Sequence, residues 1–269
     1  MTKTLEEIIN SLRNLTDKEV YRSSDFGIEF GTYAPRVLSA INVKSIVVSP
    51  FVNLKLIHFM NENKANLVLT VLPLPFTTKN FPLSESNFEI LRSLVTNNIK
   101  TMKLPEEWIC AKNGSFKYFA QTLGISKIEP FNLTLNSEKT IPYWSLPNLS
   151  YEDFLSSLSH SNKKWLTYPY APSDSKLSIV LEKQSFSQDD FEQFKKNSIS
   201  TILSFNLDTR RVHEYQKHKI NYIFIPFLDY CNISLRKFSQ ILQLETNEKV
   251  LFYSHKTINW KSYEELKLN

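Results

Sequence analysis

Side chains whose types and spacing could support a reaction are few in this sequence. Glu106 and Glu107 follow the end of a predicted strand, where a pair of carboxylates could act as general acid and base. Adjacent residues of a loop usually point apart, however, and two exposed glutamates after a proline are common. Asp229 and Cys231 could join them in a displaced site, although a packed and inert cysteine is the simpler interpretation of Cys231. These four residues alone do not indicate a reaction.

The histidines do not form a metal-binding motif. His213 and His218 lie five positions apart, so about 140° separates them on a helix. They therefore cannot share one face as the two histidines of an HExxH motif do. Together with the arginines and lysines beside them, they indicate a solvated basic surface.

Glycine is scarce, and this scarcity argues against several enzyme classes. Only Gly27, Gly31, Gly114 and Gly124 occur among 269 residues. Phosphate-binding turns of the GxGxxG and P-loop types need glycines in close succession, and neither motif is present. The GxSxG turn of serine hydrolases is also missing from the sequence.

The composition is that of an ordinary globular protein, with 42% hydrophobic and 22% charged residues. Two cysteines, Cys110 and Cys231, are too few to suggest a disulfide framework. No apolar run reaches the roughly 18 residues of a membrane-spanning helix, and the first residues do not resemble a secretory signal. We therefore expect a cytoplasmic protein without a membrane partner. A net charge of +5 is only a weak indication of nucleic acid, because the lysines are spread along the chain.

The elements that must position these side chains alternate between strands and helices. Short apolar runs rich in β-branched residues predict buried strands, and apolar residues at helical spacing predict the helices between them. Strands are predicted at 45–51, 65–73, 99–104, 176–183, 199–206, 221–227 and 249–255, and helices at 3–14, 53–64, 85–98, 115–124, 188–197, 207–218 and 233–243.

This alternation predicts the α/β fold class, with two lobes that each contain a parallel-rich or mixed sheet flanked by helices. The predicted first lobe covers residues 1–128 and the second covers residues 176–269. Residues 129–175 contain several prolines and one short helical pattern, and they are interpreted as a connector. The sequence leaves open whether the last strand, 249–255, belongs to the second lobe or returns to the first.

Several separated stretches, taken in order, are similar to the motifs of one family. "SSDFGIEFG" (23–31) is similar to a Trp-Asp-Asn-x-Gly-Leu-x-x-Gly opening and places Gly27 and Gly31 on its glycines. Residues 44–76 are similar to a strand–helix–strand unit that leads to His-His-Pro.

The second group of motifs continues the match. Residues 98–125 are similar to a segment that carries His-Thr-x-x-Asp, with Gly114 and Gly124 on its glycines. Residues 220–242 are similar to a strand and helix that carry Gly-His-x-x-x-Glu. The chain thus resembles the NIF-three-like proteins, which are also known as homologues of GTP cyclohydrolase one type two. The resemblance implies a two-lobed α/β fold with a dinuclear metal site in the cleft between the lobes. It also implies assembly as a homo-oligomer, either a dimer or a hexamer.

Read without gaps, the resemblance places four of the five metal ligands of the family on residues that cannot bind metal, and the fifth on a cysteine. The corresponding positions are Val71, Leu72, Ile109, Phe227 and Cys231. Metal ions need lone pairs from imidazole, carboxylate or thiolate groups at about 2.0–2.3 Å, and four of these five side chains have none. We therefore expect no metal and no cofactor, and we expect the cleft to be closed by a hydrophobic contact between the lobes.

The leading hypothesis is a metal-free, non-catalytic protein that acts by binding, as a scaffold or structural protein with a possible protein partner. A first alternative is a metal-dependent hydrolase of GTP or of phosphate esters, with a displaced site that includes Glu106, Glu107 or Asp229. A second alternative is a nucleic-acid-binding protein, which rests only on a pI of about 9.0.

Overall fold

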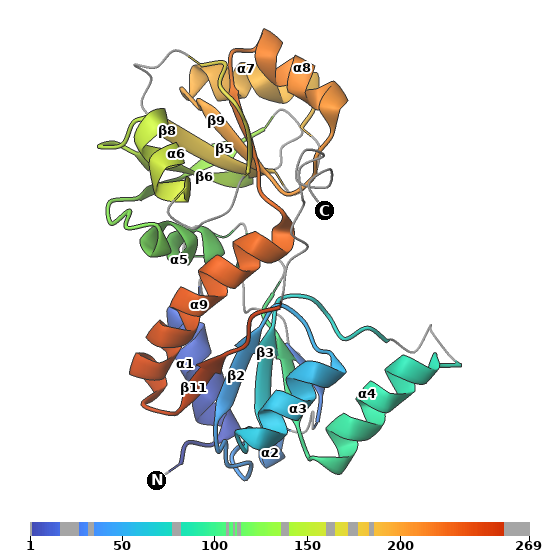
Figure 1. Ribbon diagram of the computed structural model, residues 1–269. Coiled ribbons are helices and arrows are strands. Elements are labelled where there is room, and N and C mark those ends of the chain that lie inside the picture. The colour runs from blue at the N-terminus through green and yellow to red at the C-terminus, as the bar shows by residue number, and fades with distance from the viewer. Residues whose placement is uncertain are drawn as a thin grey trace, which may run out of the picture.

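The computed structural model contains two β-sheets with helices packed against both (Figure 1). The structure describes residues 2–16, 27–31, 35–76, 82–105, 108–109, 111, 114–135, 140–159, 165–171, 177–182 and 186–255. In Figure 1 the first sheet lies below and the second above, with α5 (Ser115–Thr122) and α9 (Phe227–Thr246) between them. The predicted α/β class, with two sheets flanked by helices, is confirmed.

The first sheet combines four parallel strands with one antiparallel edge strand. All residues of the two central strands are buried, as expected for β-branched apolar runs covered on both faces. The spatial order is β1 (Ile28–Phe30), β4 (Lys100–Lys103), β3 (Leu67–Thr70), β2 (Ile46–Ser49) and β11 (Val250–Phe252).

Each face of the first sheet packs against its own helices, because successive strand residues point to opposite faces. Val47 and Val68 pack with α3 (Leu54–Glu62) and α4 (Glu85–Thr96), whereas Ile46 and Leu67 belong to the core that includes α1 (Leu5–Leu15) and α9. α3 begins at Asn53, whose side chain accepts a hydrogen bond from the backbone N–H of Leu56 at 2.9 Å. The short helix α2 (Pro35–Leu38) follows β1.

The second sheet places three parallel strands between antiparallel neighbours. Its spatial order is β5 (Glu129–Thr134), β6 (Thr140–Leu146), β8 (Leu177–Glu182), β9 (Thr201–Ser204), β10 (Asn221–Phe224) and β7 (Leu166–Tyr168). Helices α7 (Gln188–Lys196) and α8 (Thr209–Lys217) cover one face, and α6 (Tyr151–Ser159) packs in the core on the other. Residues 129–175, interpreted from sequence as a connector, contribute β5, β6 and β7 to this sheet.

α9 connects the two sheets, since it follows β10 of the second sheet and precedes β11 of the first. The strand predicted at 221–227 ends at Phe224, and the helix predicted at 233–243 already begins at Phe227, so both sequence predictions were wrong at this junction. Pro226 explains the difference. It lacks the N–H that would continue a strand, and its carbonyl accepts the first helical hydrogen bond, from the N–H of Tyr230 at 3.1 Å.

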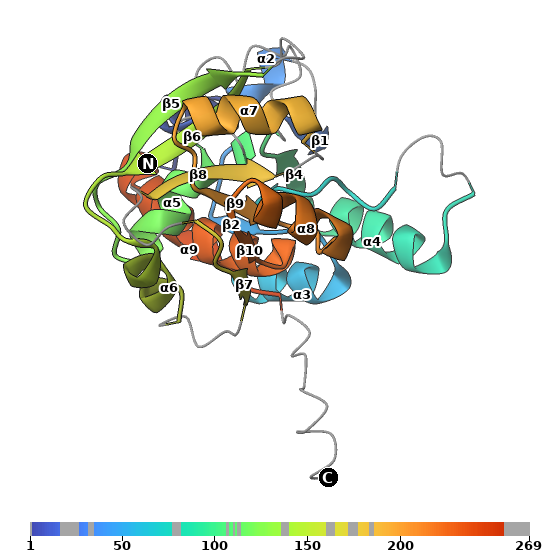
Figure 2. The same ribbon diagram turned by 90° about the horizontal axis from the view of Figure 1, so that it is seen from above.

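One hydrophobic core extends from the first sheet through α9 and α5 into the second sheet. It contains Leu69 of the first sheet, Leu203 of the second, and Phe238 of α9. Seen from above, the second sheet overlies the first, and α4 extends to the side (Figure 2). Among the helices that the structure describes, none is long and apolar enough to cross a membrane.

Candidate functional site

The corner after β3 corresponds to the His-His-Pro segment of the resemblance. Val71 is 2% exposed and belongs to the core that reaches both sheets, whereas Leu72 is half-buried. The backbone N–H groups of both residues donate to the carbonyl of Pro50, at 3.2 and 2.9 Å. The corner is therefore held by its backbone, and its side chains offer no lone pair to an ion.

Ile109 occupies the second expected ligand position and is 5% exposed. Its carbonyl accepts a hydrogen bond from Ser115 Oγ at 3.0 Å, and the Tyr230 hydroxyl donates to Ser115 Oγ at 2.7 Å. Since Ser115 begins α5 and Tyr230 lies on α9, this buried chain of hydrogen bonds ties the segment around Ile109 to both helices.

Phe227 and Cys231 lie one turn apart on α9, and so they face the same side of the helix. Phe227 packs edge-on against Phe205, with ring centroids 5.4 Å apart. Cys231 is 2% exposed, and burial raises the pKa of its thiol far above the ordinary value. A thiol that stays protonated is a poor metal ligand and a poor nucleophile.

Four of the five expected positions thus contribute to one hydrophobic core. Val71, Ile109 and Cys231 are members of this core, and Phe227 packs against its margin. The residues at these five positions do not fit a dinuclear metal centre, because only Cys231 carries a donor atom and a single donor cannot hold two ions. Within the described ranges, no three His, Cys, Asp or Glu side chains gather closely enough to hold a metal ion.

Of the alternative polar candidates Glu106, Glu107 and Asp229, the structure describes Asp229. Asp229 lies in the first turn of α9 and is 6% exposed, at the helix end where a carboxylate is favoured by the backbone dipoles. Glu106 and Glu107 lie outside the described residues.

Two of the four family glycines, Gly27 and Gly114, occupy positions with no room for a side chain. Gly27 has a φ of +72°, and a Cβ atom there would lie 2.3 Å from the carbonyl oxygen of Lys103. A Cβ atom at Gly114 would lie 1.9 Å from the carbonyl oxygen of Trp108. Gly124 follows the C-terminal end of α5 with open space around it, and Gly31 contacts the side chain of Lys100.

Sequence reasoning missed a buried polar cluster at the carboxyl edge of the first sheet. His255, 7% exposed, places Nε2 at 3.0 Å from Ser49 Oγ and at 3.0 Å from the carbonyl oxygen of Phe51. Its Nδ1 lies 3.4 Å from Asn53 Nδ2, and its ring stacks on that of Phe51 with centroids 3.7 Å apart. Ser49 lies in the predicted strand 45–51 and His255 ends the predicted strand 249–255, but the sequence left open whether these two strands share a sheet.

The Ser49–His255 pair has the spacing of a nucleophile and its base, but its hydrogen bonds assign it a structural role. Asn53 Oδ1 accepts from the N–H of Leu56, so the Asn53 amide presents its N–H to Nδ1 of the histidine. Nδ1 therefore accepts, and Nε2 carries the proton. A protonated Nε2 cannot take a proton from Ser49, which is itself fully buried.

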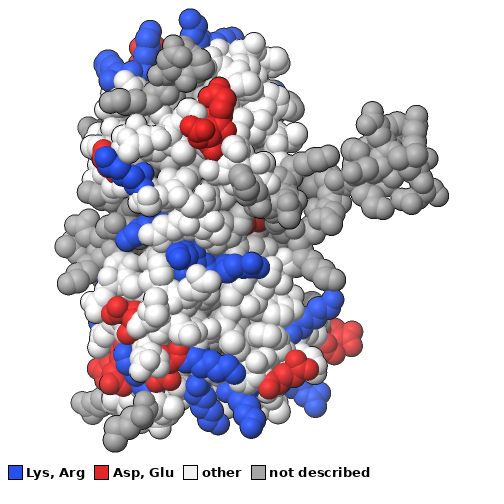
Figure 3. All heavy atoms as spheres, turned by 60° about the vertical axis from the view of Figure 1, so that its left-hand side comes forward, with Lys and Arg blue, Asp and Glu red and all other residues white. Residues whose placement is uncertain are grey.

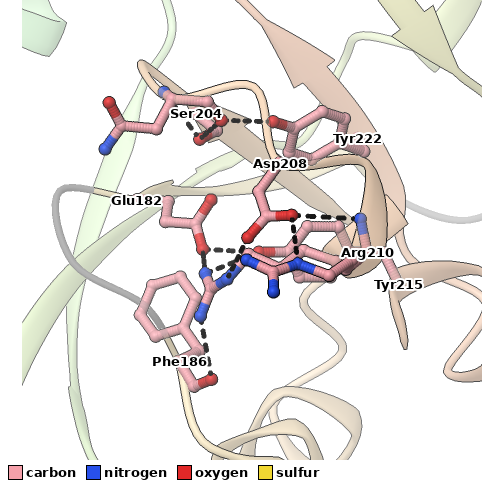
Figure 4. Close-up of polar contacts among 9 residues, drawn as sticks. Glu182, Phe186, Ser204, Asp208, Arg210, Tyr215 and Tyr222 are labelled. Atoms are coloured by element: carbon pink, nitrogen blue, oxygen red, sulfur yellow. Dashed lines mark hydrogen bonds and ion pairs between the residues drawn. The ribbon is translucent and has the colours of Figure 1, made fainter. Parts of the chain in front are cut away.

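A second polar cluster lies at the carboxyl edge of the second sheet (Figure 4). Glu182, the last residue of β8, is 3% exposed and accepts hydrogen bonds from Arg211 and Tyr215 of α8. Asp208 accepts from the backbone N–H of Arg210 at 3.0 Å and caps the same helix. Since Glu182 is neutralised by Arg211, the cluster anchors α8 to the sheet.

The surface charge is mixed on the face that Figure 3 shows. Among the described residues on that face, groups of Lys and Arg side chains alternate with groups of Asp and Glu and form no continuous basic surface. The modest net charge therefore does not concentrate there as it would on a surface for nucleic acid.

Comparisons with known proteins agree with the fold. Reduced HcgD from Methanocaldococcus jannaschii matches with a TM-score of 0.71 and 15% identity, over 95% of this chain and 99% of that chain. The Bacillus cereus protein related to NIF3 matches with a TM-score of 0.69 and 11% identity, over 97% and 100% of the two chains. Staphylococcus aureus hypothetical protein SA1388 matches with a TM-score of 0.71 and 13% identity, over 97% of this chain and 100% of that chain. No curated protein matches the chain.

At these identities the solved structures show a shared fold only. The sequence model of one family, Duf34/NIF3 (NGG1p interacting factor 3), matches residues 3–259 and therefore nearly the whole chain. This chain belongs to the Duf34/NIF3 (NGG1p interacting factor 3) family.

Proposed function

We propose that this chain is a metal-free, non-catalytic member of the Duf34/NIF3 family that acts by binding, as a scaffold or structural protein. The observation that carries the proposal is the burial of apolar residues at the expected ligand positions. Val71 and Ile109 are 2% and 5% exposed and lie in the core that joins the two sheets. A site of this kind can hold the sheets together, but it cannot polarise a substrate or activate water.

The identity of the residues at these positions supports the loss of a site rather than its relocation. Metal-binding residues that are substituted at random in an open, water-filled cleft are expected to be replaced often by polar residues. Here Leu72 and Phe227 are also apolar, and both are at least half-buried. Burial of apolar area contributes about 25 cal/mol per Å², so closing such a cleft stabilises the contact between the sheets.

A binding or scaffold role implies that function lies on surfaces or subunit interfaces. We propose that the chain forms a homo-oligomer, a dimer or a hexamer, and that a protein partner is recruited by the assembled form. Light scattering coupled to gel filtration measures this directly. A single species with the mass of one chain at all concentrations would contradict the scaffold proposal.

Elemental analysis of the purified protein tests the metal-free proposal. We expect substoichiometric zinc, iron and manganese, and we expect the same result after incubation with each metal followed by desalting. The variant Cys231→Ser is the matched control, because it removes the one donor at the expected positions and should leave the metal content unchanged. Stoichiometric metal in the parent protein would overturn the proposal.

The hydrolase alternative makes a distinct prediction for the same sample. A displaced site would bind metal in the parent protein and lose it when Glu106 and Glu107 are both changed to Gln. It would also hydrolyse GTP or 4-nitrophenyl phosphate in the metal-loaded form. We expect neither result.

A further inference from the structure

A groove opens beside the edge strand of the first sheet, between α2, α4 and the start of β4. Its volume is about 370 Å³, within the range of small-molecule sites, and its walls are mainly apolar. The residues that form these walls include Phe30, Val37, Ile41, Val95 and Ile99.

The walls reach solvent. Val37 and Val95 are 42% and 61% exposed. Phe88 does not line the groove, but it lies seven positions before Val95 on the same face of α4 and is 55% exposed. Large apolar side chains gathered at a groove of a soluble protein mark a surface that contacts a ligand or a partner.

Lys100 supplies the charged end of the groove. Its aliphatic stem packs over Gly31, where an added Cβ atom would lie 3.1 Å from Lys100 Cγ. The ammonium group donates to the carbonyl oxygen of Asn98 at 3.1 Å and to the Asn98 side chain. Burial lowers the pKa of this lysine, and no carboxylate in the described part of the chain forms an ion pair with it.

The groove is separate from the candidate site described above. Lys100 is the first residue of β4, and Val71 follows the last residue of β3. Because β3 and β4 are parallel, the two positions lie at opposite ends of the sheet. A ligand in the groove would therefore leave the core around Val71 untouched.

We propose that this groove binds a small amphipathic anion, with its apolar body against Val37 and Val95 and its anionic head on Lys100. The apolar walls favour a hydrocarbon body, and an ammonium without a carboxylate partner among the described residues favours a negative head group. A lysine acts as a point charge without the fork geometry of arginine, so both a carboxylate and a phosphate monoester fit.

Isothermal titration calorimetry of the full chain with octanoate, octyl phosphate and octanol, each below its micellar concentration, tests the proposal. We expect at least one anion to bind with a stoichiometry of one per chain and to bind more tightly than octanol. The anion that binds more tightly identifies the head group, carboxylate or phosphate, that the groove prefers. Failure of both anions to bind, or equal affinity for octanol and for the better anion, would overturn the proposal.

Variants locate the site. Lys100→Met keeps the aliphatic stem and should weaken binding of the anion by about tenfold or more, since a hydrogen bond to a charged group is lost. Val95→Glu adds a negative charge to a solvent-exposed wall and should abolish binding without unfolding the chain. Lys55→Met, at an exposed lysine of α3, is the matched control and should bind like the parent. An unchanged affinity of Lys100→Met for the anion would refute the assignment of the head group to Lys100. This outcome is independent of the metal content of the protein, which tests the proposed function.

Discussion

The substitution Phe238→Ala should greatly destabilise the protein, because Phe238 lies where α9 connects the two sheets. The side chain is fully buried, and its ring lies 5.1 Å from that of Trp108 and 5.3 Å from that of Tyr118 on α5. Removing a buried ring loses about 1.5–3 kcal/mol of transfer free energy and leaves a cavity, so that such substitutions cost about 3–5 kcal/mol in total. Alanine recovers about 0.5 kcal/mol through its higher helix propensity. We expect a net loss of about 2.5–4.5 kcal/mol in the free energy of unfolding, a large part of the roughly 5–15 kcal/mol of a typical domain.

Urea denaturation followed by tryptophan fluorescence and by far-ultraviolet circular dichroism measures this loss. Trp108 is fully buried beside Phe238, so its emission reports on the contact between α9 and the segment before α5. Because one core contains residues of both sheets, the two signals should change in a single transition. Leu244→Ala, on the same helix but 82% exposed, is the control and should change stability by less than about 0.5 kcal/mol. A loss below about 1 kcal/mol in Phe238→Ala, or two separate transitions in the parent, would refute the reasoning.

Three further predictions concern buried groups. Burial lowers the pKa of His255, so the unfolded chain binds its proton first as the pH falls. The contribution of His255 to stability should be complete above its ordinary pKa of 6.5 and should decline by up to about 1.4 kcal/mol per pH unit, down to its lowered folded pKa. In His255→Gln, the free energy of unfolding measured by urea denaturation should depend less steeply on pH between these limits. An unchanged slope of the free energy against pH would exclude this residue as the cause. In a variant with Cys110→Ser, the remaining thiol of Cys231 should react with Ellman's reagent only when the protein unfolds, and immediate reaction would disprove its burial. Arg211→Met should cost about 3–5 kcal/mol because Glu182 keeps a buried charge, whereas adding Glu182→Met should restore much of the loss; equal costs in urea denaturation for the single and double variants would contradict the ion pair.

Local patterns were sufficient to predict most helices and the buried parallel strands. The run around Ile46 and the cap at Asn53 each encode their element within a few residues, so the prediction needs no distant contact. The hairpin of β5 and β6 has no such encoding, because its strands mix exposed, half-buried and buried residues without a regular period and contain Pro130 and Pro142. At Pro226 the apolar run continues into α9, and hydrophobicity alone cannot show where the strand ends.

The candidate sites differ in how far the sequence could predict them. The apolar character of the expected ligand positions was visible in the sequence, and the structure adds that Val71 and Ile109 lie in one core. The cluster around His255 joins residues separated by 206 positions, through a strand whose lobe the sequence left open. The groove at Lys100 likewise depends on β1 lying beside β4, a pairing that no local pattern predicted.

The return of β11 to the first sheet affects how the protein is made. β2 ends at Ser49 and pairs with β11, which ends at Phe252, so one side of this strand has no neighbour until β11 has also left the ribosome. At about 5–20 residues per second, translation of the intervening segment takes roughly 10–40 s. During that time β2 exposes unpaired backbone groups and apolar side chains to other nascent chains. Chaperone dependence and aggregation of truncated products should therefore depend on the last strand of the sheet, although that strand contains only three residues.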